Sequence, residues 1–435
     1  MAQAHAAFPR RAPELISAAM ESNLISLRWS DGLRRIFHPL WLRDNCSSRR
    51  HPGTRQRLFS AANLPRPLQM KMIETDDDTL RVQWGSERTS SFCATWLRDH
   101  GSDPDQVTAS FTEATDDDAA AADAARASPA AAVYCTELDD LRCGGEAALW
   151  RWLRALSTDG ATLVRGVPEH VSQSTKLAPV DGVRFLAELI GPLQPNIYGD
   201  IFDVVSKGAA AENLAYTSEA IGPHMDLCYY ESPPGLQLLH CLQFDEDVAG
   251  GGSLLIDGFA VAEAVRAAAP AAFGTLSNVP ATFLKDHSRR ERPVLLSYQR
   301  PHFATDPRDG RLTGVFWSPP FEGPLCGLSP AEVGAYYEAY RVLDAAIAAA
   351  PKWEHRLQPG EVLVFNNRRM LHGRQSFEAA RGGGRHLRGC YVNIDEYANT
   401  LNLLRRAHEP DGVEPPIGNQ DWARGVVELP HEAGA

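Results

Sequence analysis

The sequence predicts a mixed α+β protein, mainly β, whose larger part is a double-sheet jelly roll preceded by a smaller β-rich part. Short Val- and Leu-rich runs bounded by Gly or Pro recur in the larger part, which is typical of strands. Long excursions separate these runs, without the regular alternation of strands and helices that a parallel sheet requires. No P-loop, dinucleotide-binding glycine fingerprint or internal repeat occurs in the 435 residues.

We expect three segments along the chain. Residues 1–112 form a small β-rich domain, in which period-two alternation predicts strands at Leu24–Trp29 and Leu80–Trp84. Residues 113–132 are acidic and alanine-rich without a large apolar side chain, and they are predicted to be a linker, with a frayed helix as the alternative. Residues 133–435 form the jelly-roll domain.

Helices and strands are both expected in this last segment. Apolar spacing predicts helices at Ala147–Leu156, Val183–Ile190 and Phe259–Phe273. A further helix should begin at Ser329, with Pro330 in its first turn and Glu332 completing a capping box, and run to about Ala349. The predicted strands are Ala161–Arg165, Gly235–Leu242, Ser253–Asp257, Val315–Trp317, Glu361–Phe365 and Gly389–Ile394.

Charge and composition narrow the possible partners. Asp and Glu number 55 against 43 Lys and Arg, so the formal net charge is −12, which argues against nucleic acid or an anionic membrane as a partner. No apolar run approaches the roughly 18 residues of a membrane span, and the first residues lack the apolar centre of a signal peptide. The eight cysteines are scattered, as in a reduced protein. We therefore expect a cytoplasmic protein.

One group of side chains has the pattern of a metal site. His224 and Asp226 are two residues apart, so on an extended segment both point to the same side. His372 lies just after the predicted strand that ends at Phe365. Two histidines and one carboxylate form the facial triad of non-haem Fe(II) oxygenases and leave other coordination positions open. Among 14 histidines a His-x-Asp pair also arises by chance, and His240 is more simply a core histidine.

Two further residues fit the same chemistry. Arg385 follows His372 by thirteen residues. A 2-oxoacid that binds iron through its keto group and first carboxylate directs its second carboxylate away from the metal, where an arginine can bind it with two hydrogen bonds. Ser253, at the start of a predicted strand, offers a hydroxyl. Taken alone, these residues would be a surface arginine and a turn serine, and only their combination with the triad favours a binding site.

The blocks that carry these residues resemble the γ-butyrobetaine dioxygenase and trimethyllysine dioxygenase family, within the larger taurine-dioxygenase-like class. The resemblance covers about residues 20–110 and 135–405 and includes His224-Met-Asp226, Leu371-His-Gly-Arg-Gln-Ser-Phe377 and Arg385-His-Leu-Arg-Gly-Cys-Tyr391. It implies a double-stranded β-helix, Fe(II), 2-oxoglutarate and O2, with ascorbate as reductant. The implied reaction hydroxylates an unactivated C–H bond of a small molecule while 2-oxoglutarate is converted to succinate and CO2.

The resemblance also assigns roles by position. His224, Asp226 and His372 resemble the iron ligands of the family. Arg385 resembles the arginine that binds the distal carboxylate of 2-oxoglutarate, and Leu239 and Ser253 match residues that line its pocket.

Four aromatic residues resemble the cage that holds a quaternary ammonium in this family, since a cation without hydrogen-bond donors is held by aromatic faces. They are Tyr198, Phe202, Tyr216 and Tyr391. Phe202 stands where the butyrobetaine enzymes have tryptophan. A buried core aromatic is the ordinary alternative for Tyr198.

The other end of the substrate pocket departs from the family. Asn213 matches a polar position, but Leu227 stands where tyrosine is common, and Ser318-Pro319 replaces an asparagine-rich region. Both changes remove hydrogen-bond partners of a buried anion. We expect a trimethylammonium acid such as γ-butyrobetaine, which would yield carnitine. The alternatives are another quaternary ammonium (2-trimethylaminoethylphosphonate or trimethyllysine), a small sulfonate or amino acid, or a non-catalytic jelly roll that binds a ligand.

The N-terminal part resembles the small β domain of the same family through Trp41–Cys46 and Trp96–Asp99. In many relatives three cysteines and a histidine bind structural zinc there. Here only Cys46 remains, with Ser47 and Ser48 after it and Arg88 near the place of the histidine. Because a four-coordinate site needs all its ligands, we expect this domain to fold without zinc and to contribute to a homodimer.

Overall fold

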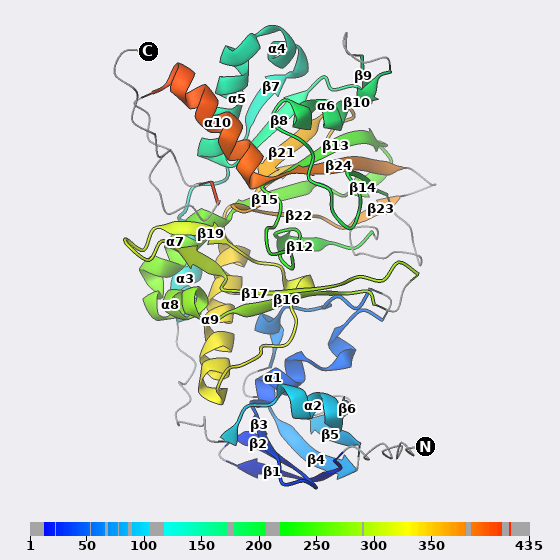
Figure 1. Ribbon diagram of the computed structural model, residues 1–435, viewed down its shortest axis with the longest axis vertical. Coiled ribbons are helices and arrows are strands. Elements are labelled where there is room, and N and C mark those ends of the chain that lie inside the picture. Colours follow the sequence, from blue (N-terminus) through cyan, green and yellow to red (C-terminus); the bar gives the residue numbers. More distant parts are fainter. Residues whose placement is uncertain are drawn as a thin grey trace, which may run out of the picture.

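The computed structural model describes residues 13–21, 23–52, 54–65, 68–76, 78–85, 89–104, 117–172, 178–205, 218–288, 291–379, 384–410 and 417–418. Asn213, Tyr216 and Arg88 lie outside these residues. Figure 1 shows the N-terminal sheets at one end, the two larger sheets at the other and the hairpin β16–β17 between them.

The N-terminal part contains two antiparallel three-stranded sheets and two short helices. The strands are β1 (Leu15–Glu21), β2 (Leu24–Trp29), β3 (Arg34–Phe37), β4 (Met70–Asp76), β5 (Thr79–Trp84) and β6 (Thr89–Cys93), and the helices are α1 (Pro39–Asp44) and α2 (Ala94–His100). Both strands predicted here are confirmed as β2 and β5. Their alternating side chains, among them Trp29 and Trp84, are buried in one core.

Two sheets dominate the larger part. The six-stranded sheet has the order β11-β24-β13-β21-β8-β7, and the four-stranded sheet the order β12-β22-β15-β20. Their bounds are β7 (Tyr134–Glu137), β8 (Ala161–Arg165), β11 (Ile201–Val204), β12 (Ile221–His224), β13 (Leu236–Phe244), β15 (Ser253–Asp257), β20 (Trp353–His355), β21 (Val362–Asn366), β22 (Met370–Arg374) and β24 (Arg385–Val392). The larger part is thus mixed but mainly β.

Short hairpins surround these sheets. They are formed by β9 (His170–Val171) with β10 (Val180–Asp181), β14 (Val248–Gly250) with β23 (Phe377–Ala379), β16 (Ala281–Asp286) with β17 (Leu295–Arg300), and β18 (Phe303–Thr305) with β19 (Leu312–Val315). The strand predicted at Val315–Trp317 is wrong beyond Val315. The Phe316 N–H still donates to the His302 carbonyl, but the Trp317 carbonyl accepts from the Met225 N–H of another segment.

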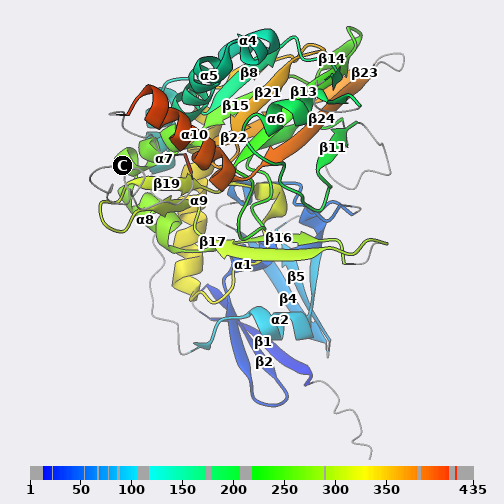
Figure 2. The same cartoon turned by 45° about the horizontal axis from the view of Figure 1, so that its top comes forward.

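The two faces of the six-stranded sheet have different partners, because successive side chains of a strand alternate between faces. Leu236 and Leu238 of β13 pack in a core with Trp152 of α5 and Tyr397 of α10, which cover the outer face (Figure 2). Leu239 of the same strand lines a cavity on the inner face. The helices on this side are α4 (Leu138–Cys143), α5 (Gly145–Asp159), α6 (Gly182–Glu188) and α10 (Ile394–His408).

A second group of helices joins the N-terminal part to the sheets: α3 (Asp117–Arg126), α7 (Gly258–Ala268), α8 (Pro270–Asn278) and α9 (Pro330–Ala349). The capping box predicted at Ser329 is confirmed, since its hydroxyl accepts from the Glu332 N–H and the Glu332 carboxylate accepts from the Ser329 N–H. The segment Phe259–Phe273, predicted to be helical, is helical apart from Ala269. It divides into α7 and α8 because Pro270 cannot donate a backbone hydrogen bond within a helix.

The segment expected to be a linker contains helix α3. Its Ala121 and Ala125 are completely buried in the core that includes residues of α7 and α9, and Asp118 forms an ion pair with Arg341. The absence of large side chains, which suggested a linker, instead lets this helix approach its neighbours closely. None of the helices among the described residues is long and apolar enough to cross a membrane.

Candidate active site

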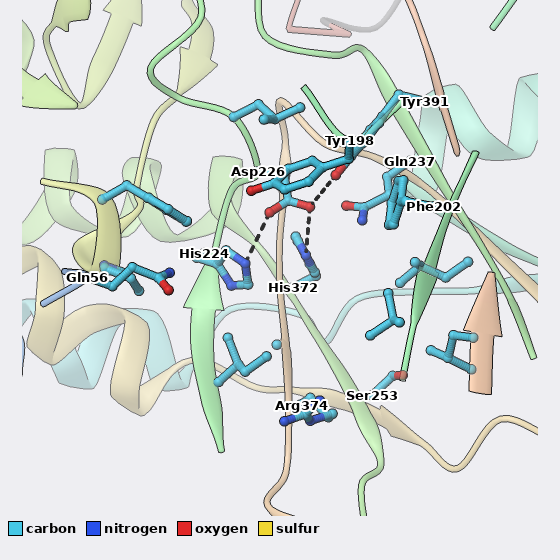
Figure 3. A pocket seen from close by; sticks show the side chains of 18 of the residues that line it. Gln56, Tyr198, Phe202, His224, Asp226, Gln237, Ser253, His372, Arg374 and Tyr391 are labelled. Carbon is cyan, nitrogen blue, oxygen red and sulfur yellow. Dashed lines mark hydrogen bonds and ion pairs between the residues drawn. The ribbon is translucent and has the colours of Figure 1, made fainter. Parts of the chain in front are cut away.

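Three side chains predicted to bind metal lie together in the structure. His224 ends β12, His372 lies in β22, and the two residues are direct partners across these antiparallel strands. Cross-strand partners share a face of the sheet, and Asp226 joins them from the segment just after β12. The His224 Nε2 is 3.3 Å from one Asp226 carboxylate oxygen, and the His372 Nε2 is 3.6 Å from the other (Figure 3). All three ligand atoms lie within 4.8 Å of one another.

Asn367 forms hydrogen bonds that link the turn before His372 to the segment that carries Asp226. Its amide oxygen accepts from the Asp226 N–H at 3.0 Å, and its amide nitrogen donates to the carbonyls of Asp226 and Pro234, both at 3.1 Å. Asn367 is 1% exposed and lies in the turn that leads from β21 to His372 in β22. The sequence analysis missed this residue. A signal for it was available, because Asn366 and Asn367 follow a strand expected to be buried.

The charges of Asp226 and His372 suit metal binding, which requires an ionised carboxylate and neutral imidazoles. Burial opposes ionisation of Asp226, but His372, His224 and the hydroxyl of Tyr391 outweigh it and hold the pKa of this carboxyl well below its usual range. Burial, followed by the nearby His224, lowers the pKa of His372 to about 3. Burial also opposes protonation of His224, yet Asp226 raises the pKa of that imidazole.

A cavity opens beside the triad and is lined from both large sheets. Nine predicted site residues line it: Tyr198, Phe202, His224, Asp226, Leu239, Ser253, His372, Arg385 and Tyr391. The sequence analysis did not select Gln56, Tyr229, Gln237 and Arg374, which also line it. Arg374 could have been predicted, because it is two residues from His372 on the same strand and therefore lies on the same face of the sheet.

Arg385 is a buried cation in the wall of this cavity. Its side chain is 8% exposed, and burial lowers the pKa of its guanidinium to about 10. The Nε atom of Arg385 has no hydrogen-bond partner among the described residues. The guanidinium carbon, Cζ, lies 5.3 Å from the ring centre of Phe244 and 5.9 Å from that of Phe377. A buried charge is costly unless it is compensated, so an anion in the cavity would suit this side chain. Arg374, whose pKa burial also lowers to about 10, donates to the Glu219 carbonyl.

A row of aromatic rings forms another wall. The ring centres of Tyr198 and Phe202 are 6.2 Å apart, and those of Phe202 and Tyr391 are 5.2 Å apart with stacked planes. Gly389 permits this arrangement, because a β-carbon there would lie 2.6 Å from the Phe202 ring. The Tyr391 hydroxyl donates to Asp226 at 2.7 Å, a contact with the triad that the sequence analysis did not foresee.

Leu227 and Ser318, the two positions that depart from the family at the anionic end of its pocket, lie in different surroundings. Leu227 lines the cavity with an aliphatic side chain and has a positive φ of 59°. Ser318 is completely buried, and its hydroxyl has no hydrogen-bond partner among the described residues.

In the N-terminal part, the Cys46 thiol is hydrogen-bonded to the hydroxyls of Ser48 and Ser90, and Trp84 donates to Ser90. Over the described ranges, the triad is the one place where three His, Cys, Asp or Glu side chains gather closely enough to hold a metal. Folding of this part without zinc remains a prediction.

Comparisons with known proteins agree with this geometry. The family model "Taurine catabolism dioxygenase TauD, TfdA family" matches residues 137–391, and "Gamma-butyrobetaine hydroxylase-like, N-terminal" matches residues 16–98. A γ-butyrobetaine dioxygenase of Pseudomonas sp. (strain AK-1) is 34% identical over 92% of this chain and 98% of its own. The dioxygenase str8 of Strobilurus tenacellus is 29% identical over 84% of each chain. A trimethyllysine dioxygenase of Meyerozyma guilliermondii is 26% identical over 91% of this chain and 97% of its own.

Proposed function

The chain belongs to the TauD, TfdA family and is a dioxygenase, and from this premise we propose that it is an Fe(II)- and 2-oxoglutarate-dependent hydroxylase of a small trimethylammonium acid such as γ-butyrobetaine. The observation that carries the proposal is one cavity in which a two-histidine, one-carboxylate triad, a buried arginine and a row of aromatic rings meet. The jelly roll belongs to the same proposal, and it is supported by two sheets that line this cavity together.

His224, Asp226 and His372 would hold the iron. Two imidazoles and a carboxylate on one face suit Fe(II) and leave positions for a bidentate co-substrate and O2. Iron bound there would supply the activation of O2. The protein then has to orient the ligands, which Asn367 and Tyr391 do through Asp226, and to keep water away from the reacting atoms, for which the buried cavity wall is suited.

Arg385 would bind the distal carboxylate of 2-oxoglutarate, with Ser253 and Leu239 beside it. The support is the charge of Arg385, its burial, and the fact that all three residues line the same cavity as the triad. Arg385 and Ser253 belong to different sheets, β24 and β15, so the co-substrate would lie between the two.

Tyr198, Phe202 and Tyr391 would hold the trimethylammonium group against their ring faces. Asn213 and Tyr216 remain predicted members of this pocket. Relatives named for γ-butyrobetaine and for trimethyllysine support a substrate of this class. Because Leu227 offers no hydrogen bond at a position where the family commonly has tyrosine, a second candidate has the same cation and a different anionic group, 2-trimethylaminoethylphosphonate.

The test is succinate formation from 2-oxoglutarate with Fe(II) and ascorbate, with and without γ-butyrobetaine. We expect stimulation by γ-butyrobetaine together with a hydroxylated product. His372→Ala should abolish turnover, whereas His386→Ala should not, because His386 pairs with Asp203 outside the cavity. Unchanged turnover by His372→Ala would refute the iron site. Unstimulated succinate formation by the wild type would instead refute γ-butyrobetaine as substrate.

We also propose a homodimer that associates through the N-terminal part. Ile16 and Met20 of β1 and Met72 of β4 are 53%, 49% and 45% exposed, and exposed apolar side chains that gather on one surface mark interaction sites. Light scattering should give twice the mass of one chain, and Ile16→Lys with Met20→Lys should give a monomer. A monomeric wild type would contradict the proposal.

A further inference from the structure

A buried lysine that the proposed function does not use lies beside the substrate cavity. Lys285 in β16 is 2% exposed, and its ammonium lies 5.0 Å from the ring centre of Phe321 and 5.9 Å from that of Tyr198. Both rings line the cavity beside the triad. A positive charge therefore stands directly behind the wall of the substrate pocket.

Gln56 connects this lysine to the cavity. Gln56, Pro320 and Phe321 line both the active-site cavity and an adjoining cavity, of which Lys285 forms another wall. Gln56 is buried, and it comes from the N-terminal part of the chain. In Figure 3 it lies on the His224 side of the pocket, whereas Ser253 and Arg374 lie on another side. The place assigned to 2-oxoglutarate and the Gln56 end are thus different parts of the cavity.

This chain needs another partner for the anionic group, because two family positions that bind it are changed. Leu227 offers no hydrogen bond to the cavity, and the hydroxyl of Ser318 does not line it. An amide donates hydrogen bonds to an anion, and an ammonium adds charge. We propose that Gln56 and Lys285 bind the anionic group of the substrate, a carboxylate or a phosphonate, while the aromatic row binds its trimethylammonium group. This inference rests on the proposed function.

The charges define the substrate class. The trimethylammonium group would lie against the ring faces of Tyr198, Phe202 and Tyr391, and the Lys285 ammonium lies on the Tyr198 side of this row, 5.9 Å from the centre of that ring. Like charges repel, so a purely cationic compound gains nothing from Lys285, whereas a dipolar compound is attracted at both ends. The site therefore selects zwitterions over choline-like cations.

The experiment compares KM values for γ-butyrobetaine, for its amide, which keeps the trimethylammonium cation but lacks the carboxylate charge, and for 2-trimethylaminoethylphosphonate. Lys285→Met keeps the length of the side chain and removes its charge, Lys285→Arg keeps the charge, and Gln56→Leu removes the amide. Lys71→Met, on the exposed strand β4, is the matched control. The KM for 2-oxoglutarate is measured in each variant.

We expect Lys285→Met to raise KM by about 10- to 100-fold for the acid that is the better substrate of the wild type. This is the effect of losing one charge-assisted hydrogen bond. The KM values for the amide and for 2-oxoglutarate should change by less than about 2-fold. Lys285→Arg should have a KM for the acid close to that of the wild type. If Lys285→Met does not fold, the same comparison is made with Gln56→Leu. Equal effects on acid and amide, or no effect on the acid, would overturn the inference. A wild type that hydroxylates no compound of the panel would refute the proposed function itself, and the inference with it.

Discussion

Asn367→Ala tests how the triad is held. The substitution removes three hydrogen bonds of 3.0–3.1 Å and leaves the Asp226 N–H and the carbonyls of Asp226 and Pro234 without their partner. At 1% exposure, water does not reach the site in the folded protein. Each unsatisfied buried group costs about 1–3 kcal/mol, so we expect a loss of at least about 3 kcal/mol in the free energy of unfolding, a large fraction of the usual total.

The assay is urea unfolding followed by tryptophan fluorescence, together with the affinity for Co(II) as a spectroscopic substitute for Fe(II). Asn367→Asp keeps the acceptor for the Asp226 N–H but loses both donated hydrogen bonds, so it should be similarly destabilised. The control is Asn278→Ala, whose exposed side chain bonds only to the Gly274 carbonyl and should change stability by less than about 0.5 kcal/mol. A loss below about 1 kcal/mol with unchanged Co(II) affinity in Asn367→Ala would refute this account.

Three further predictions concern other parts of the molecule. Arg385→Ala should raise KM for 2-oxoglutarate by about 10- to 100-fold, as expected for a lost charge-assisted bond, and leave KM for the primary substrate nearly unchanged; the reverse pattern in steady-state kinetics would exclude the assigned role. Gly389→Ala should displace the Phe202 ring, because the new β-carbon would lie 2.6 Å from it, and raise KM for the trimethylammonium substrate, so a kinetically silent variant would speak against the cage. Burial raises the pKa of Glu322 to about 7, so the folded protein binds this proton more tightly than the unfolded chain, and the stability supplied by the proton should be lost as pH rises from about 5 to about 7; unfolding midpoints of Glu322→Gln should vary less over this interval, and identical pH profiles would contradict the assignment.

The sequence was sufficient to predict the three side chains of the triad, but not the strand pairing and the hydrogen bonds that position them. His224, Asp226 and His372 could be selected because metal ligands are restricted to few residue types and His-x-Asp spacing is local. That His224 and His372 are cross-strand partners depends on the register of β12 and β22, which spacing along the chain does not reveal. Asn367 acts through backbone groups of a distant segment. The Asn366-Asn367 pair after a buried strand indicates a polar turn, but it does not indicate which groups Asn367 binds.

Helix and strand predictions succeeded where the signal was local and failed where packing decided. The capping box at Ser329 is contained within four residues, and the strand at Leu24–Trp29 shows its alternation directly. Ala121 and Ala125 of α3 are buried in a core that includes residues of α7 and α9, and the sequence pattern does not reveal that packing. Gln56 reaches the active-site cavity from the N-terminal part, and only the three-dimensional arrangement places it there.

The central claim is that the triad directs O2 into two products, one atom to each. In the proposed reaction, substrate, 2-oxoglutarate and O2 give hydroxylated substrate, succinate and CO2, so both oxygen atoms are accounted for. Turnover of γ-butyrobetaine under 18O2, followed by mass spectrometry, measures this directly. We predict one labelled oxygen in succinate and one in the hydroxylated product. Succinate without label, or a product whose new oxygen comes from water, would contradict the account.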